Sequence, residues 1–115
     1  MKIQLIRRLF ITAAVLATLL APDAANANAR SVSGCTVSQT GGDAGRVNMT
    51  CGGVVYYAQT WGSCFTTNAE TVKMWGSYML SAFLSGKKMT VYYDDGVGKA
   101  GCTGTNWITG LMITN

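Results

Sequence analysis

Four cysteines are the residues of this chain whose type and spacing can carry chemistry. Cys35, Cys51, Cys64 and Cys102 all lie beyond residue 29, and the sequence contains no histidine. No Cys-x-x-Cys pair occurs, which argues against a four-cysteine zinc site. An even number of cysteines in a short exported chain is typical of a disulfide framework, for which three pairings exist here. We therefore predict two structural disulfides and no metal site.

The spacing of the cysteines favours one of the three pairings. The segment Thr40–Gly45 is rich in turn residues, and the alternating segments on either side predict a hairpin centred on Asp43. Cys35 and Cys51 are equidistant from that centre, so they would face each other across the two strands within bridging distance. The predicted pairs are Cys35–Cys51 and, by elimination, Cys64–Cys102.

Little else in the sequence is suited to catalysis. Without histidine, the Ser-His-Asp and Cys-His devices are excluded. Asp94-Asp95 lie in an apparent turn, where turn formation is the first interpretation and calcium binding the second. No glycine-rich phosphate loop precedes a helix, and a Ser-Lys catalyst has no supporting spacing. We expect a protein that is not an enzyme and needs no cofactor.

The N-terminal segment has the pattern of a secretory signal. Three basic residues precede the apolar run Leu9–Ala21, and Pro22 ends that run. The run is shorter than the roughly 20 residues that span a bilayer, and small residues suited to a signal peptidase follow it. We predict a cleavable signal over residues 1–29 and a single secreted or periplasmic domain over residues 30–115, with no membrane span.

Two alternatives to simple export follow from the same segment. The run could remain attached as an uncleaved anchor, although Pro22 and the small-residue sites argue against this. Val32-Ser33-Gly34-Cys35 has the form of a lipobox, but lipidation of Cys35 would leave an odd number of cysteines in an oxidising compartment.

The charge of the predicted domain is low and scattered. Residues 30–115 carry six basic and four acidic side chains, for a net charge of +2. Lys87-Lys88 is the only basic pair, which is too little for a stripe that binds the phosphates of a nucleic acid. We expect no nucleic-acid partner.

Hydrophobic periodicity predicts three strands, one helix and two further strands. Thr67 and Glu70 form a capping-box pattern at the start of the helix, Gly86 is suited to its end, and Gly76 suggests a close packing contact. The predicted apolar stripe of the helix is Val72, Trp75, Met79, Ala82 and Phe83, and Leu80 and Leu84 widen it. The predicted strands are Ser31–Gln39, Arg46–Cys51, Val54–Thr60, Met89–Tyr93 and Trp107–Thr114, and the predicted helix is 68–85.

This order of elements defines the predicted fold class. It is mainly β with one α-helix, and a helix between the third and fourth of five strands is the layout of the OB-fold barrel. We predict a five-stranded OB-fold-like barrel stapled by disulfides. Such barrels bind oligonucleotides or oligosaccharides, but fold alone does not decide function.

The segment Trp75–Gly96 carries a resemblance to a known family. It consists of a predicted helix, a Ser-Gly break and a strand that ends in Tyr92-Tyr93 and an acidic residue. In this it resembles the pentameric binding (B) subunits of AB-type bacterial toxins, nearest to those of subtilase cytotoxin and typhoid toxin. The resemblance covers this segment closely and the remaining chain in layout.

The resemblance implies a function and a site. It implies an exported OB-fold domain that forms a homopentamer, accompanies a toxic A subunit and binds sialylated glycans at cell surfaces. It implies Tyr93 as a glycan contact. Aromatic faces beside hydrogen-bonding groups suit a sugar, which adds Tyr92, Asp94, Asn106 and Trp107 as candidates.

Two competing interpretations remain open. The aromatic side chains could belong to the core or to a subunit interface, because large aromatics dominate the cores of small domains. The chain could also be a monomeric periplasmic module, structural or inhibitory, that binds another protein. Burial of Tyr93 and the state of assembly distinguish these interpretations from glycan recognition.

Overall fold

The computed structural model describes residues 28–114. The predicted signal over residues 1–29 lies outside the described residues except for its last two. Ala29 already belongs to the first strand, where it pairs with Asp94, so the strand begins one residue before the predicted domain boundary. Within residues 28–114, no helix is long and apolar enough to cross a membrane.

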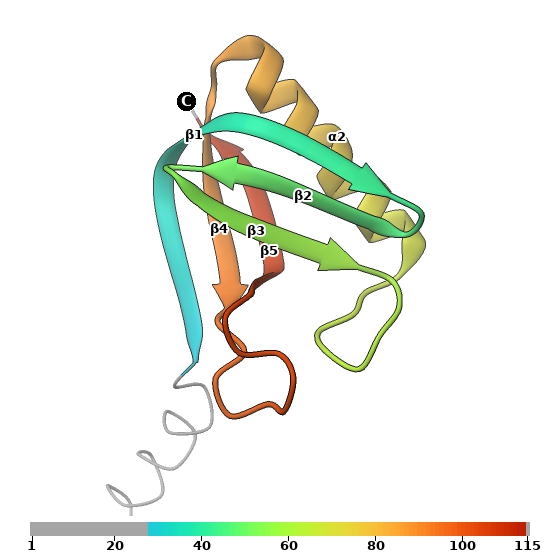
Figure 1. Cartoon of the computed structure of the whole chain (residues 1–115). Helices are drawn as coiled ribbons and strands as arrows, with labels where there is room; N and C mark the ends of the chain where they lie inside the picture. Colours follow the sequence, from blue (N-terminus) through green and yellow to red (C-terminus); the bar gives the residue numbers. More distant parts are fainter. Residues whose placement is uncertain (1–27, 115) are drawn as a thin grey trace, which may run out of the picture.

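Five strands and one helix build the domain (Figure 1). The strands pair in the order β1-β2-β3-β5-β4, and β4 pairs with β1, which closes a ring of hydrogen-bonded strands. The pairs are antiparallel except for β3 with β5, which is parallel. The predicted order, mainly β with one helix after the third strand, is confirmed. The elements are β1 (Ala29–Asp43), β2 (Arg46–Cys51), β3 (Val54–Gln59), α2 (Ala69–Ser85), β4 (Lys88–Asp94) and β5 (Asn106–Thr114).

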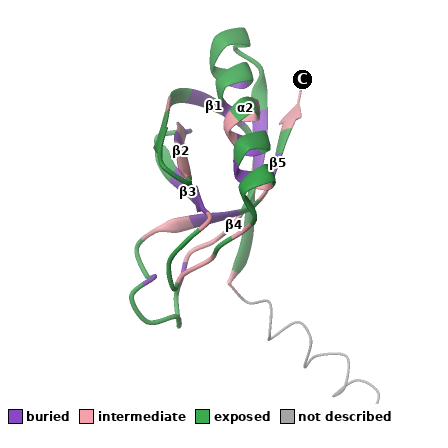
Figure 2. Cartoon of the chain, turned by 90° about the vertical axis from the view of Figure 1, so that its right-hand side faces the viewer, coloured by how far each residue is buried: buried purple, intermediate pink, exposed green. Residues whose placement is uncertain are grey.

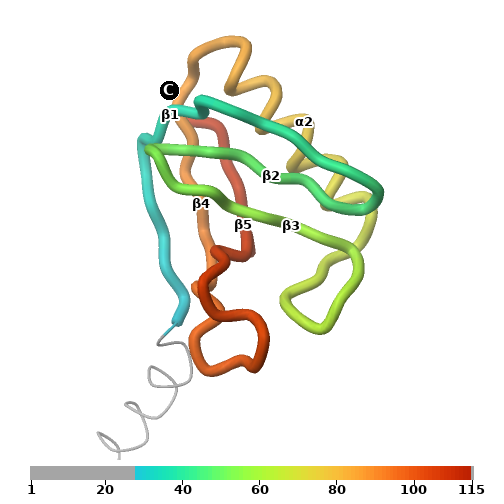
Figure 3. Tube along the Cα trace, in the orientation of Figure 1, coloured from blue at the N-terminus to red at the C-terminus, as the bar shows by residue number. Residues whose placement is uncertain are grey.

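Strand β1 joins two sides of the ring because it changes partner along its length. Its first half pairs with β4 and its second half with β2, and the trace in Figure 3 shows the bend between the halves. Gly34 lies at the register shift between Val32 and Cys35, with φ +65°. That left-handed backbone conformation is one that glycine adopts without strain, so this residue permits the bend.

The hairpin between β1 and β2 turns later than the sequence predicted. Strand β1 continues through the predicted turn cluster to Asp43, which pairs with Arg46. The turn residues are therefore Ala44 and Gly45, and the prediction of a turn centred on Asp43 is wrong. A β-carbon on Gly42 would lie 2.5 Å from the carbonyl oxygen of Arg46. Gly42 therefore lets β1 and β2 approach each other closely. It does not form part of the turn.

The shifted turn changes how Cys35 meets Cys51, although the predicted disulfide is present. Cys51 pairs with Val37, and a register irregularity follows Val37. Cys35 therefore reaches Cys51 diagonally, with their Cα atoms 5.5 Å apart. Because Cys35 is part of this disulfide, no free thiol is present there for the lipid of the lipobox alternative.

Helix α2 begins and ends at identifiable caps. The side chain of Asn68 accepts a hydrogen bond from the backbone N–H of Thr71 at 2.8 Å, so the cap is Asn68 and the predicted capping box at Thr67 is wrong. Asparagine and threonine are both good caps, and the sequence placed both at the boundary. At the other end Gly86, with φ +73°, donates its N–H to the carbonyl of Ala82, as its position predicted.

One face of α2 covers β1, β2 and β5. A β-carbon on Gly76 would lie 3.2 Å from a methyl of Val47, which identifies the close contact that the sequence suggested. Phe83, predicted in the buried stripe, is instead 44% exposed. Figure 2 shows exposed residues along the side of the helix that faces away from the strands. The buried face consists of Val72, Trp75, Met79 and Ala82.

The core lies between the helix and the ring of strands. Met49, Met79 and Met89 are fully buried, together with Val91. Methionine is unbranched and fills irregular space, which suits the junction between a helix and a strongly curved sheet. The Cys35–Cys51 disulfide belongs to this same core cluster.

Candidate functional site

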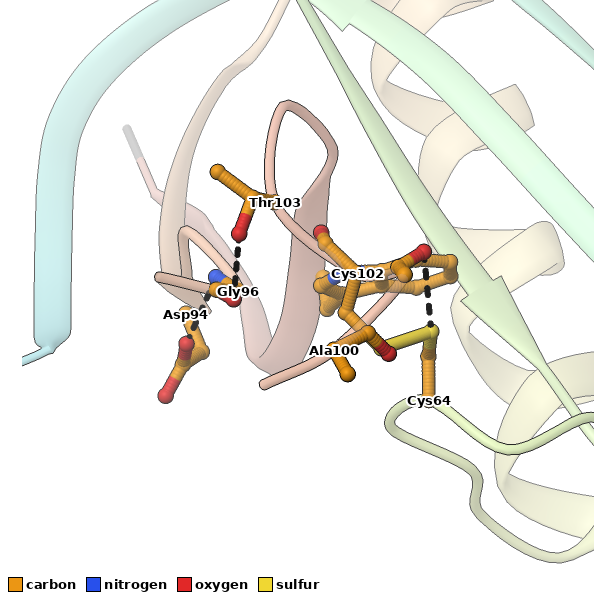
Figure 4. The surroundings of a disulfide bond; sticks show 8 residues. Cys64, Asp94, Gly96, Ala100, Cys102 and Thr103 are labelled. Atoms are coloured by element: carbon orange, nitrogen blue, oxygen red, sulfur yellow. Dashed lines mark hydrogen bonds between the residues drawn. A yellow bond between two sulfur atoms is a disulfide. The ribbon is translucent and has the colours of Figure 1, made fainter. Parts of the chain in front are cut away.

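Two long loops lie at one end of the molecule, and the loop between β4 and β5 lies close to the start of β1 (Figure 1). Residues 60–68 connect β3 to α2, and residues 95–105 connect β4 to β5. The predicted Cys64–Cys102 disulfide is present and joins these loops, with its Cα atoms 5.7 Å apart (Figure 4). We refer to residues 60–68 and 95–105 as the loop end.

The loop of residues 95–105 is held by its own hydrogen bonds, drawn in Figure 4. The N–H of Gly96 donates to a carboxylate oxygen of Asp94 at 2.8 Å, and the hydroxyl of Thr103 donates to the Gly96 carbonyl at 3.1 Å. Asp94, a predicted site residue, therefore closes a turn. Its other carboxylate oxygen is not used in that bond.

The neighbouring Asp95 ties this loop to β1. Its carboxylate accepts a hydrogen bond from the N–H of Val97 and forms an ion pair with Arg30, both at 3.0 Å. The Val97 N–H, and then the Arg30 guanidinium, hold the pKa of Asp95 below its usual range. Within residues 28–114, no three acidic, cysteine or histidine side chains come together as a metal site.

Tyr93 lies at the margin of the core. It is half-buried, packs against the core cluster, and meets Tyr56 edge to face with ring centroids 5.1 Å apart. Burial, and secondarily the neighbouring Tyr93, raises the pKa of the Tyr56 phenol. Tyr93, which the resemblance implies as a glycan contact, therefore packs part of its surface against the core.

Tyr92 has a different environment because neighbouring strand residues point to opposite faces. It is 44% exposed. Its side chain lies over Gly110 of β5, where a β-carbon would be only 3.1 Å from the Tyr92 ring. One side of the ring therefore rests on the strand, and the other side is available to a ligand.

Tyr92 lines a shallow pocket of about 280 Å³. Arg30 and Ser31 of β1 and Thr109 of β5 line it together with the tyrosine. Ser31 is the register partner of Tyr92, and Thr109 precedes Gly110. The pocket is lined by an aromatic residue, by an arginine whose Nε donates to Asp95, and by two residues that carry hydroxyl groups. We refer to Arg30, Ser31, Tyr92 and Thr109 as the Tyr92 site.

The remaining candidates, Asn106 and Trp107, lie elsewhere and are used structurally. Trp107 is only 8% exposed, its indole N–H donates to the Cys102 carbonyl at 3.1 Å, and its ring lies 6.5 Å from Tyr57 and 6.4 Å from Phe65. The Asn106 amide donates to the carbonyl of Val55 at 3.5 Å. Neither residue lines the Tyr92 pocket, so the structure does not bring the five predicted residues into one site.

Sequence reasoning missed three of the four members of the Tyr92 site. Arg30 and Ser31 join it because β1 pairs with β4, and Thr109 joins it because β5 pairs with β4 on the other side. The available signal was the OB-fold layout itself, which places the first strand beside the fourth. Applied to the predicted strands, that layout would have placed the start of the first strand beside Tyr92-Tyr93.

No protein family matches the chain, and no curated protein matches it significantly. Chemically, an exposed aromatic ring can stack on a flat apolar surface, and neighbouring hydroxyl groups can donate or accept hydrogen bonds.

Proposed function

We propose that this protein is an exported, non-enzymatic binding module of OB-fold type that recognises glycans. The closed strand order β1-β2-β3-β5-β4, with α2 between β3 and β4, supports the OB-fold assignment. Two disulfides support an oxidising compartment, secreted or periplasmic. The resemblance of Trp75–Gly96 to toxin binding subunits supports glycan as the ligand class.

The observation that carries this proposal is the exposed ring of Tyr92. It rests on Gly110, so it is rigid without being covered. Arg30 also lines the pocket. Its Nε donates to Asp95 at 3.0 Å, and its Nη groups remain as donors for a carboxylate, which makes a sialylated glycan the preferred ligand. We therefore place the contact at Tyr92 rather than at Tyr93, and we assign Tyr93 a supporting role beneath it.

Self-association into a ring is the second part of the proposal. Four large apolar side chains on α2 are exposed, among them Leu84 at 73% and Leu80 at 50%. Exposed apolar groups of this kind mark interfaces, and heterologous contacts that close generate rings. A homopentamer is the assembly that the toxin resemblance implies, and a toxic A subunit is the partner that such a ring would carry.

The binding test uses the oxidised protein and sialyllactose in isothermal titration calorimetry. We expect measurable binding that Tyr92→Ala weakens by up to about tenfold, since one aromatic contact contributes about 0.5–1.5 kcal/mol beyond the area that it buries. Trp61→Ala is the control, because Trp61 is an aromatic residue of 55% exposure that lies neither in the Tyr92 pocket nor on α2. Equal affinity in both variants would exclude the Tyr92 site.

The assembly test is the native mass by light scattering. We expect five subunits for the oxidised protein and monomers for Leu80→Glu/Leu84→Glu, which places charge on the exposed helix face. A monomeric parent protein would exclude the ring. A monomer that also fails to bind sialyllactose would favour the periplasmic protein-binding module instead.

A further inference from the structure

A second pocket lies where β3 and β5 separate. These strands pair only through Tyr56 with Asn106 and Tyr57 with Trp107, so the ladder ends there and leaves a gap further along both strands. The gap is a pocket of about 220 Å³, which we refer to as the β3–β5 pocket. Its lining comes from the loop of residues 60–68 and from Ala58, Gln59, Trp75, Ile108 and Thr109.

Thr109 joins this pocket to the pocket at Tyr92, because it lines both. Tyr92 pairs with Gly110 and Tyr93 pairs with Ile108, which leaves Thr109 as an extra residue of β5 without a partner on β4. A β-bulge of this kind re-aims a side chain, and Thr109 is exposed. Each pocket alone is smaller than small-molecule sites usually are, but the two volumes together fall within the typical range of about 300–1,000 Å³.

Gln59 gives the β3–β5 pocket a polar group that the fold does not use. The residue is only 6% exposed, and its amide nitrogen lies beside Gly62, where a β-carbon would be 3.0 Å away. Its carboxamide makes no side-chain hydrogen bond among residues 28–114, yet it is not fully enclosed. Buried polar side chains normally have hydrogen-bond partners. A ligand hydroxyl group in the pocket would supply one, since it can both donate to and accept from a carboxamide.

The two pockets differ in charge. Arg30 lines the Tyr92 pocket, whereas no charged residue lines the β3–β5 pocket. Thr66 and Thr67 line the β3–β5 pocket instead, and because Asn68 caps α2, the helix does not use the Thr67 hydroxyl. This lining suits a neutral ligand that carries hydroxyl groups. A charged ligand would lose its hydration there without gaining a partner of opposite charge.

We propose that the β3–β5 pocket is a second subsite, which binds the neutral sugar next to the acidic sugar at the Tyr92 site. This inference rests on the proposed glycan recognition and makes its ligand more specific: the unit bound is a sialic acid joined to a neutral hexose. The acidic sugar lies against Tyr92 with its carboxylate toward Arg30. The linkage passes over Thr109, and the hexose hydroxyls hydrogen-bond to Gln59 and to the threonines of the loop.

The test is an NMR titration of the oxidised protein with two ligands, sialyllactose and the methyl α-glycoside of N-acetylneuraminic acid, which lacks the neutral sugar. We expect sialyllactose to bind at least about tenfold more tightly. It should also shift the side-chain amide signals of Gln59, which the methyl glycoside should leave in place. Equal affinities, or tighter binding without a shift at Gln59, would overturn the second subsite and leave glycan recognition at Tyr92 standing. Binding of neither ligand would overturn both.

A matched pair of tyrosine variants tests the subsite by steric block. Ser63 and Thr66 are both exposed residues of the loop of residues 60–68, but only Thr66 lines the β3–β5 pocket. Thr66→Tyr should place a ring at the pocket and reduce the affinity for sialyllactose about tenfold, toward that for the methyl glycoside. Ser63→Tyr adds the same ring outside both pockets and should leave both affinities unchanged. An equal loss in the two variants would show that the loop as a whole affects binding and would refute the subsite.

Discussion

The two disulfides act in regions that differ in what else holds the chain. Cys35–Cys51 crosses the β1–β2 hairpin, where a ladder of paired residues from Val37 to Asp43 already fixes both strands. Cys64–Cys102 crosses the loop end, where neither loop belongs to a strand or a helix. Their Cα separations are nearly equal, 5.5 and 5.7 Å. The difference lies in the surroundings, not in the bridges.

The two disulfides also differ in the length of chain that each one spans. The hairpin disulfide spans 16 residues and the loop-end disulfide spans 38. In the chain-entropy view, the longer loop restricts the unfolded chain more. In the folded state no backbone hydrogen bond joins the two described loops, so we expect the disulfide to be a main link between them. We therefore expect Cys64–Cys102 to stabilise the protein more than Cys35–Cys51, both by restricting the unfolded chain and by linking the folded loops.

The largest effect should follow removal of the loop-end bridge. We expect Cys64→Ala/Cys102→Ala to lower the free energy of unfolding by about 4 kcal/mol, from the 38-residue separation. Urea denaturation measures this loss, and amide hydrogen exchange should show faster exchange in residues 95–105. A loss smaller than that of the hairpin double variant would contradict the comparison.

Removal of the hairpin bridge should have a smaller effect. We expect Cys35→Ala/Cys51→Ala to lower the free energy of unfolding by about 3 kcal/mol, from the 16-residue separation. Because the ladder of β1 and β2 remains, circular dichroism of the folded variant should retain its strand signal. Loss of that signal at neutral pH without denaturant would show that the bridge, and not the ladder, forms the hairpin.

Local sequence signals predicted the elements and the cysteine pairs but not the details of the hairpin. Glycine has two uses, positive φ in turns and close approach within strands, and the sequence does not distinguish them. Gly42 is a case of close approach and Gly45, with φ +76°, is a case of a turn. The pairing of Cys35 with Cys51 was correct although the turn was misplaced, because the register irregularity of β1 removes part of the shift and the disulfide spans the remaining offset diagonally.

The candidate site was only partly predictable because it depends on long-range pairing. Tyr92 could be named from its place beside Tyr93, but which of the two faces solvent depends on the sheet that they enter. Trp107 was expected at a binding surface and is buried, because the Cys102 carbonyl and Phe65 of the loop end cover it. Arg30 is distant in sequence from Tyr92 and reaches it only through the β1–β4 ladder.

A matched pair of glycine variants sharpens the contrast in packing. Gly96 in the loop end and Gly34 in β1 both have positive φ, at +74° and +65°. A β-carbon on Gly96 would overlap the Cys102 carbonyl oxygen, whereas one on Gly34 would meet no atom within 4 Å. Gly34→Ala should cost about 1–2 kcal/mol from backbone strain alone, and Gly96→Ala should cost a further 1–3 kcal/mol or so from overpacking.

Thermal or urea unfolding of the two glycine variants measures this difference. Equal losses would mean that the loop of residues 95–105 moves aside at no cost. That result would contradict the view that its contacts with Cys102 are closely packed. The difference between the variants is the informative quantity, because the strain at positive φ is common to both.

The smallest effect concerns the ion pair that joins the loop end to the ring of strands. The pKa of Asp95 is lowered from its ordinary value of 3.8 by the Val97 N–H first and by Arg30 second. Because its folded-state pKa is lower than its unfolded-state pKa, Asp95 contributes stability above pH 3.8, and that contribution is lost as the pH falls below this value. An NMR titration of the Asp95 carboxyl group should therefore give a midpoint below 3.8.

Two variants separate the causes of this shift. Asp95→Asn should make stability less dependent on pH in the acidic range, measured by thermal unfolding between about pH 6 and about pH 3. Arg30→Gln removes the guanidinium but keeps the Val97 N–H, so the pKa of Asp95 should stay below 3.8. If Arg30→Gln instead returned the Asp95 midpoint to 3.8, the contact with β1 would be the main cause. The order of the loop end would then depend on its link to the ring rather than on its own backbone.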